Sequence, residues 1–150
     1  MSNLSPVMDV ERIYVEREHR EMAERIDHLH DIAGLVGTIS TGEFRFALGG
    51  ILDWIEAILE PHSAWEENWL YPHIDVASGT TWVTRLMRYE HQQIRDAASR
   101  LRADQHALRH ELTHGQVVDL RGRIYALEAL IRAHLDREEH VVLPLLDGLG

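Results

Sequence analysis

The chain of 150 residues contains no cysteine. This absence excludes disulfide bonds, thiolate metal sites, cysteine-held iron–sulfur clusters and cysteine nucleophiles. Glycine and proline are also scarce, with 10 and 4 residues, so long helices can form. No apolar run is long enough to span a membrane, and the N-terminus lacks the basic and then apolar pattern of a secretory signal. We therefore expect a cytoplasmic protein with no membrane partner.

Positive charge is in deficit, because 15 basic residues face 25 acidic residues and the net charge is -10. Phosphate binding relies on basic patches, so we expect no nucleic-acid partner. Histidine, by contrast, is abundant with 11 residues, and it is the commonest nitrogen ligand for iron, zinc and copper. The length predicts a single domain over residues 1–150, with a core from about 7 to 144. We expect a monomer or a small homo-oligomer.

Four segments carry the apolar periodicity of helices, and they cover residues 7–33, 44–70, 81–112 and 116–142. We expect Pro61 to kink the second segment, Pro72 to end it, Thr80 to cap the third, and Pro144 to end the fourth. No alternating strand pattern of useful length is present. Four helices with short connections predict an all-α, up-down-up-down four-helix bundle.

The two halves of the chain repeat the same residue types 72 positions apart. The matched pairs are His19/His91, His62/His134, Glu66/Glu138, Glu18/Glu90, Gly50/Gly122, Glu67/Glu139 and Pro72/Pro144. The first two helices should therefore superimpose on the last two about a pseudo-two-fold axis. Neither helical hairpin could bury its apolar face alone, so we expect the two hairpins to pack against each other.

Each half carries a single histidine and a His-x-x-x-Glu pair. Residues four apart on a helix share one face, so both side chains of such a pair can reach one metal cluster. The predicted ligands of a dinuclear centre are His19, His62, Glu66, His91, His134 and Glu138. Each metal would take two histidine nitrogens, and the two glutamates would bridge the metals. This ligand set favours iron or manganese, with zinc as a further alternative, and it leaves positions open for oxo, hydroxo, water or a small molecule.

Three other interpretations stay open. Each His-x-x-x-Glu could be a surface pair on a metal-free interaction bundle. A ferritin-like site would use the Glu-x-x-His pairs Glu16/His19 and Glu111/His114, although these pairs break the repeat. His28 rivals His19 as the ligand from the first helix, but it too breaks the symmetry.

Metal-bound histidines usually donate their other nitrogen to a carboxylate or a carbonyl. The candidates for this role are Glu18, Glu67, Glu90 and Glu139. The tryptophans and phenylalanines are expected in the core or at helix interfaces. Any of the four tyrosines could donate a proton or an electron if it lay near the metals. We assign no catalytic residue beyond the metal ligands.

The segments Glu90-His91-Gln92, His62-Ser63-Ala64-Trp65-Glu66-Glu67 and His134-Leu135-Asp136-Arg137-Glu138-Glu139 resemble the hemerythrin-like, or HHE cation-binding, domain. The resemblance covers residues 18–144. It implies a four-helix bundle that holds a non-haem di-iron centre bridged by two carboxylates, with the same six ligands. Oxygen-carrying hemerythrins have a further histidine where this chain has Arg95, and an aspartate on the last helix where it has Glu138. The resemblance therefore favours the hemerythrin-like enzymes over oxygen carriage.

The leading hypothesis is a di-iron protein that reacts with a small oxidant. Disproportionation of hydrogen peroxide, or peroxidase chemistry, is the preferred reaction, with nitric oxide as a possible co-substrate. The alternative is non-enzymatic: a carrier or sensor of oxygen, nitric oxide or iron, or an iron donor for cluster repair. The family's repair proteins carry an additional cysteine-bearing segment, and this chain has no cysteine. Sustained turnover of peroxide would distinguish the enzyme from the carrier.

Overall fold

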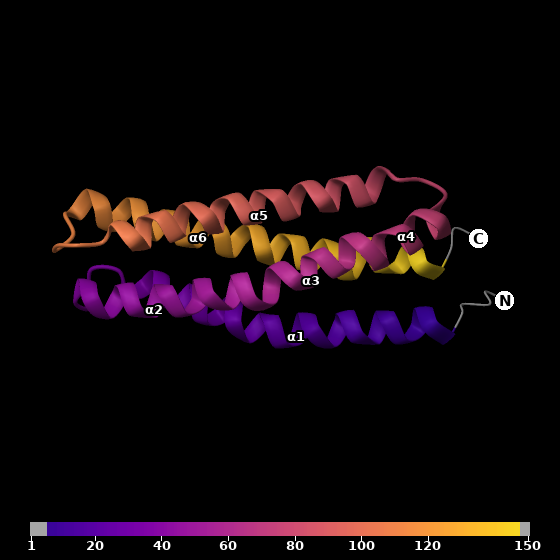
Figure 1. The fold of residues 1–150 in the computed structure, drawn as a ribbon, viewed down its shortest axis with the longest axis horizontal. Helices are drawn as coiled ribbons and strands as arrows, with labels where there is room; N and C mark the ends of the chain where they lie inside the picture. The colour runs from indigo at the N-terminus through magenta and orange to yellow at the C-terminus, as the bar shows by residue number, and fades with distance from the viewer. Residues whose placement is uncertain (1–5, 148–150) are drawn as a thin grey trace.

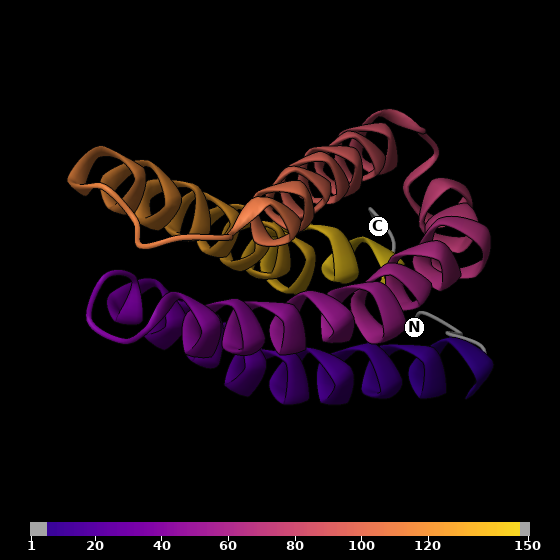
Figure 2. The ribbon, with the colours of Figure 1, turned by 60° about the vertical axis from the view of Figure 1, so that its left-hand side comes forward.

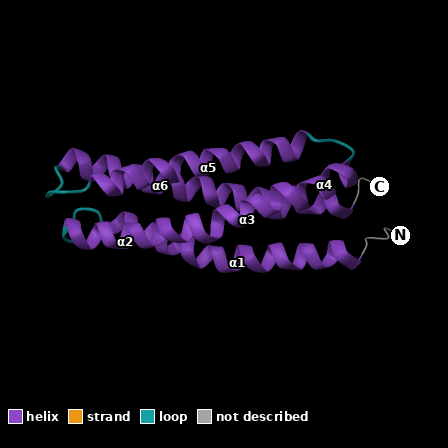
Figure 3. Cartoon of the chain, in the orientation of Figure 1, coloured by secondary structure: helices purple, strands orange, loops and turns teal. Residues whose placement is uncertain are grey.

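The protein is a bundle of four antiparallel helical runs (Figures 1 and 3). The structure is a computed structural model that describes the backbone of residues 6–147 and the side chains of residues 12–147. The first and third runs are single helices, α1 (Pro6–Leu35) and α5 (Trp82–Ala107). The second run comprises α2 (Thr41–Trp54), η1 (Ile55–Leu59), α3 (Glu60–Trp65), η2 (Glu66–Leu70) and α4 (Tyr71–Ser78). The fourth comprises α6 (His114–Arg137), η3 (Glu138–Val142) and η4 (Leu143–Asp147).

The predicted fold class is confirmed, since the described part of the chain contains four helical runs and no strand. In that same part, no helix is both long and apolar enough to cross a membrane. Figure 2 shows the second run bending at α4 toward the start of α5, while α1 begins and η4 ends at the same end of the bundle.

Local sequence signals set several of the helix ends. Ser40 and Glu43 form a capping box at the start of α2, and Thr113 and Gln116 form another at the start of α6. Each box satisfies backbone N–H groups that have no partner within the helix. Gly79 ends α4 in the left-handed conformation, with a φ of 72°, which glycine adopts without steric cost.

The prediction that Pro72 would end the second run was wrong, and near Pro61 the α-helix is interrupted by the π segment η1. Both prolines lie at the second residue of a short α-helix that directly follows a π-helical segment, so the run continues to Ser78. In each π segment the amide N–H of the residue before the proline bonds to the carbonyl five residues earlier. This wider turn accommodates a residue that has no N–H to donate.

Other helix boundaries also differ from the predictions. The third run ends at Ala107, and its N-cap is Thr81, one residue after the predicted Thr80. In the fourth run the α-helix begins at His114, turns π-helical at Glu138 and becomes a 3₁₀ turn around Pro144. Helix ends depend on a few local hydrogen bonds, which apolar periodicity does not report.

Two apolar clusters fill the bundle. The larger cluster lies toward the loops that join α1 to α2 and α5 to α6. Its fully buried members include Ile32, Leu48, Ile124 and Leu127. The smaller cluster lies at the end of the bundle where α1 begins. It comprises Val15, Leu70, Tyr71, Ile74, Met87, Val142, Leu143 and Leu146. Burying one such aliphatic side chain contributes about 1.5–3 kcal/mol. Truncating one of them to alanine would cost about 2–5 kcal/mol.

The prediction that the tryptophans and phenylalanines lie in the core or at helix interfaces was wrong in part. Phe44 is buried, and Trp54 and Trp65 are half-buried against the two clusters. Phe46, Trp69 and Trp82 are exposed. A four-helix bundle buries only one stripe of each helix, so aromatic residues outside that stripe remain at the surface.

Candidate metal centre

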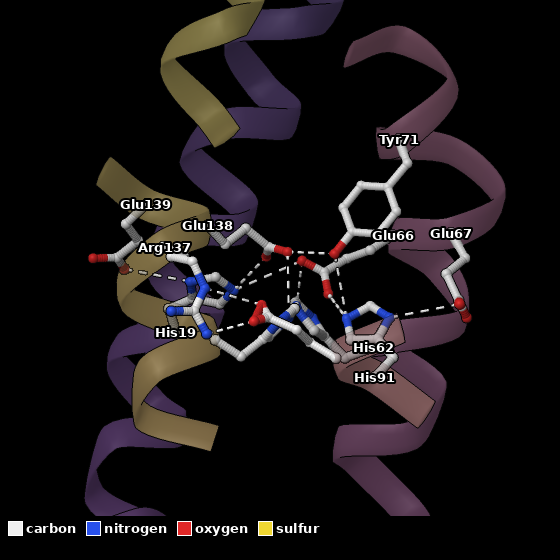
Figure 4. Close-up of polar contacts among 11 residues, drawn as sticks. His19, His62, Glu66, Glu67, Tyr71, His91, Arg137, Glu138 and Glu139 are labelled. Carbon is white, nitrogen blue, oxygen red and sulfur yellow. Dashed lines mark hydrogen bonds and ion pairs between the residues drawn. The ribbon is translucent and has the colours of Figure 1, made fainter. Parts of the chain in front are cut away.

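The six predicted ligands meet in one polar layer between the two apolar clusters (Figure 4). The ligands come from all four helical runs. His19 lies on α1, His62 on α3 and His91 on α5. His134 comes from the last turn of α6, while Glu66 and Glu138 are the first residues of η2 and η3. All six residues are buried. Helices from both halves of the chain therefore point polar groups at a common centre.

Glu66 lies within reach of three histidines. Its Oε1 is 3.2 Å from His91 Nε2, and its Oε2 is 3.4 Å from His62 Nε2. Oε2 is also 3.8 Å from His19 Nε2. The carboxylate thus extends from its own half of the chain to a histidine of the other half, as a bridging group must.

Glu138 occupies the equivalent position on the other side. Its Oε1 is 3.0 Å from His19 Nε2, and its Oε2 is 3.5 Å from His134 Nε2. Two sets of donor atoms result, and within each set the atoms lie within 4.8 Å of one another. The first set is His19, His62, Glu66 and Glu138, and the second is Glu66, His91, His134 and Glu138. Both glutamates belong to both sets, which matches the predicted dinuclear arrangement.

Many atoms that face this centre have no hydrogen-bond partner. They include His19 Nε2, His62 Nε2, His134 Nε2, Glu66 Oε2 and Glu138 Oε1. A buried polar atom without a partner costs about 1–3 kcal/mol, so such atoms rarely gather in one place. Nitrogen and carboxylate oxygen donors directed at the same two points fit a pair of divalent or trivalent cations. The donor set is therefore suited to metal ions.

Four more glutamates lie beside the outer nitrogens of the histidines. Within the same half, Glu18 accepts a hydrogen bond from His62 Nδ1, and Glu90 accepts one from His134 Nδ1 at 3.2 Å. Across the halves, Glu139 lies 3.4 Å from His19 Nδ1, and Glu67 lies 3.7 Å from His91 Nδ1. A carboxylate at Nδ1 keeps the proton there, so the lone pair of Nε2 faces the centre. Glu18 and Glu90 thus make the contact that their predicted role requires, whereas Glu67 and Glu139 lie beside His91 and His19 without a hydrogen bond.

The surroundings of Glu66 and Glu90 favour their charged forms. Burial by itself would raise the pKa of Glu66, but the neighbouring imidazoles of His19, His62 and His91 lower that pKa well below its usual range. At Glu90 burial also opposes the charge, and His134 and Arg137 together lower its pKa. A negative Glu66 at the centre favours the binding of cations.

Tyr71 adds a hydroxyl to the centre. Its O–H donates to Glu138 Oε2 at 2.5 Å and lies 3.3 Å from His91 Nε2. The ring is completely buried and stacks on the His91 imidazole at 5.6 Å between centroids. Burial, together with the charge of Glu66, raises the pKa of Tyr71 well above its usual value. The phenol therefore stays protonated beside the two metal positions.

Two neighbours of the centre were missed by the sequence analysis. Arg137 binds both oxygens of Glu90, and Trp65 lies beside His62. Both residues come three positions after a predicted histidine ligand, so each faces nearly the same side of its helix. Their spacing from the histidines could have indicated that they lie near the centre. The comparison of the two halves did not indicate it, because Trp65 and Arg137 stand at equivalent positions and are different residue types.

The rival residues do not reach the centre. His28 is exposed on α1, which removes it as an alternative to His19. Glu111 and His114 are exposed near the start of α6, at the interhelical-loop end of the bundle. The Glu-x-x-His pairs of a ferritin-like site are therefore not brought together.

The fold and the centre define a class of protein: four-helix bundles with a histidine and carboxylate site suited to cations. Comparison with protein families agrees, because the model of the hemerythrin HHE cation binding domain matches residues 13–146. The chain belongs to this family. No curated protein and no solved structure matches the chain.

Proposed function

We propose that the chain binds two iron ions through the six ligands and that the loaded protein disproportionates or reduces hydrogen peroxide. The observation that carries this proposal is the pair of four-atom donor sets that share Glu66 and Glu138. Six side chains cannot fill two octahedral coordination shells, so a small molecule can reach the metals. When bound, a pair of redox-active metal ions would supply the electrons for cleavage of an O–O bond.

The protein's own residues then handle charge, orientation and protons. Glu18 and Glu90 orient the imidazoles of His62 and His134 and increase their basicity. Tyr71 holds its proton next to Glu138 and His91, where cleavage of an O–O bond requires a proton donor. The two apolar clusters on either side exclude bulk water from the centre.

The test starts with the protein purified in air. We expect about two irons per chain, near-ultraviolet bands from an oxo bridge, and sustained oxygen release after peroxide addition. The matched control is the same chain loaded with zinc, which fills the ligands but has no redox chemistry. A second control is His140→Ala, because His140 is an exposed histidine that pairs only with its own helix.

The outcomes separate the alternatives. Iron at this ratio without turnover would overturn the enzymatic proposal in favour of a carrier, a sensor or an iron donor. Stoichiometric zinc or manganese in the purified protein would replace iron as the metal. If the double variant His62→Ala with His134→Ala kept both its metal content and its stability, the six residues would not be the ligands.

A further inference from the structure

The side of the centre next to His62 leads to the surface through two aromatic rings. The Trp65 ring lies 6.4 Å from the His62 imidazole, and the Tyr14 ring lies 5.2 Å from Trp65 in an edge-on arrangement, both between ring centroids. Trp65 is half-buried, and Tyr14 is 39% exposed. The three rings form a continuous series from a buried candidate ligand to solvent.

This series has no counterpart in the other half of the chain. At the 72-residue offset, Leu86 takes the place of Tyr14 and Arg137 takes the place of Trp65. Arg137 is ion-paired with Glu90, and neither leucine nor arginine gives up a single electron readily. The aromatic neighbour on that side is Tyr71, which is completely buried. Among the side chains that the structure describes, a series of rings therefore runs from His62 to the surface, and none runs to the surface from His134.

Glu18 connects the outer end of this series to the inner end. Its carboxylate accepts a hydrogen bond from His62 Nδ1 and lies beside the phenol of Tyr14. The neighbouring Glu18, followed by burial, raises the pKa of Tyr14, so the phenol is protonated at neutral pH. A tyrosine that loses an electron becomes a strong acid, and Tyr14, at 39% exposure, can release that proton to solvent.

We propose that Trp65 and Tyr14 conduct single electrons from a small aromatic reductant at the surface to the metal centre beside His62. This inference rests on the proposed function, because it needs a centre that peroxide has oxidised. Reduction of one hydrogen peroxide to two waters takes two electrons and two protons. Two molecules of a phenol-class reductant supply them, and each becomes a radical after losing one electron and one proton.

Each single transfer balances within the protein. Tyr14 passes one electron inward through Trp65 toward the centre and releases its phenolic proton to solvent, since Tyr14 is 39% exposed. The reductant then returns one electron and one proton to the tyrosyl radical. A proton from solvent accompanies the electron into the water that forms. Disproportionation needs no such route, because a second peroxide supplies both electrons at the metals themselves.

The experiment measures two rates on the iron-loaded full chain with peroxide, namely oxidation of guaiacol and release of oxygen. In Trp65→Phe, which keeps an aromatic ring against His62, guaiacol oxidation should fall by about tenfold or more relative to oxygen release. Tyr14→Phe should change the ratio in the same direction. The matched controls are Trp82→Phe and Tyr89→Phe, since both side chains are exposed on α5, and the ratio should stay at the wild-type value.

A second readout does not depend on turnover. Electron paramagnetic resonance after rapid freezing with peroxide should show a radical on Tyr14 or Trp65, identified by deuterated tyrosine or tryptophan and lost in the matching variant. Iron content is measured in every variant, so that a folding or loading defect is recognised. An unchanged ratio in Trp65→Phe at full iron content, or a radical confined to Tyr71, would overturn the inference. A wild-type protein that neither releases oxygen nor oxidises guaiacol would overturn the proposed function itself.

Discussion

The two halves of the chain build the same ligands but support them differently. In the first half, Glu18 accepts a hydrogen bond from His62 and lies beside Tyr14, next to the ring of Trp65. In the second half, Glu90 binds His134 and is held by both guanidinium nitrogens of Arg137. The first half therefore surrounds its outer carboxylate with aromatic groups, whereas the second surrounds it with a positive charge.

The two halves also differ in the residues that contact the bridging glutamates at the centre. Tyr71 donates a hydrogen bond to Glu138, while the residue at the equivalent position in the second half is the buried Leu143. A repeated helical hairpin can conserve the residues that a cation requires and still let their neighbours diverge. The repeat thus preserves the groups that could hold a cation, whereas the residues around those groups differ between the halves.

The largest effect is expected from the shared carboxylates. Glu66→Gln should remove metal from both positions, because Glu66 belongs to both donor sets, and Glu138→Gln should do the same. His62→Ala, by contrast, removes a donor from one set and should leave about one metal ion per chain. Metal analysis by mass spectrometry measures the difference. Equal metal loss in Glu66→Gln and His62→Ala would contradict the bridging arrangement.

The outer carboxylates should give an intermediate effect. Glu18→Gln and Glu90→Gln should each lower metal affinity by about 10–100-fold, because each releases the orientation of one histidine. The loss should be larger for Glu90→Gln, since this variant also leaves Arg137 without its partner. Competition with a chelator of known affinity measures both constants. Glu21→Gln, at an exposed position of α1, is the matched control. If Glu18→Gln bound metal as tightly as this control, the proposed role of the outer carboxylates would be wrong.

The third comparison concerns the hydroxyl of Tyr71, which the equivalent residue Leu143 lacks. In the metal-free protein, Tyr71→Phe should lower the free energy of unfolding by about 1.5–3 kcal/mol, because it removes a buried hydrogen bond to the charged Glu138. Leu143→Met at the equivalent position keeps the volume and should cost less than about 1.5 kcal/mol. Urea denaturation measures both changes. A Tyr71→Phe protein as stable as the wild type would show that the hydrogen bond contributes nothing to stability.

The smallest effect concerns the protonation of two equivalent histidines in the metal-free protein. At His62 burial is the largest single influence and lowers the pKa, but the neighbouring Glu66 and Glu18 together outweigh it, so the pKa is raised above 6.5. At His134 burial dominates and the pKa is lowered below 6.5. The contribution of His62 to stability is therefore complete below pH 6.5 and is lost as the pH rises through its folded pKa. For His134 the sign is opposite, since protonation of the unfolded chain removes stability as the pH falls below 6.5.

Nuclear magnetic resonance of labelled histidine measures the two titrations separately. His62 should still be protonated at a pH where His134 is already neutral. The reverse order would mean that burial, and not the neighbouring carboxylates, controls both groups.

The candidate ligands could be predicted from the sequence because both halves of the chain contain the same set of histidines and glutamates. The pairs His62/Glu66 and His134/Glu138 lie one helical turn apart, and any helix places both members of such a pair on one face. His19 and His91 were added to the predicted ligands because they are separated by the same 72 positions. The structure places all six residues together. The prediction for Pro72 was wrong, because an α-helical rule was applied where this proline follows a wider π turn.

The sequence by itself determined the helical class, the repeat and the residue types at the centre, because helical periodicity and residue spacing are local properties. Only the tertiary structure decided which groups complete the centre. The hydroxyl of Tyr71 reaches Glu138, 67 positions away in the chain, and Glu90 meets Arg137 across 47 positions. The contacts of Glu139 with His19 and of Glu67 with His91 depend in the same way on how the four runs pack. Packing of side chains between distant segments creates these contacts, and no spacing within a single helix encodes them.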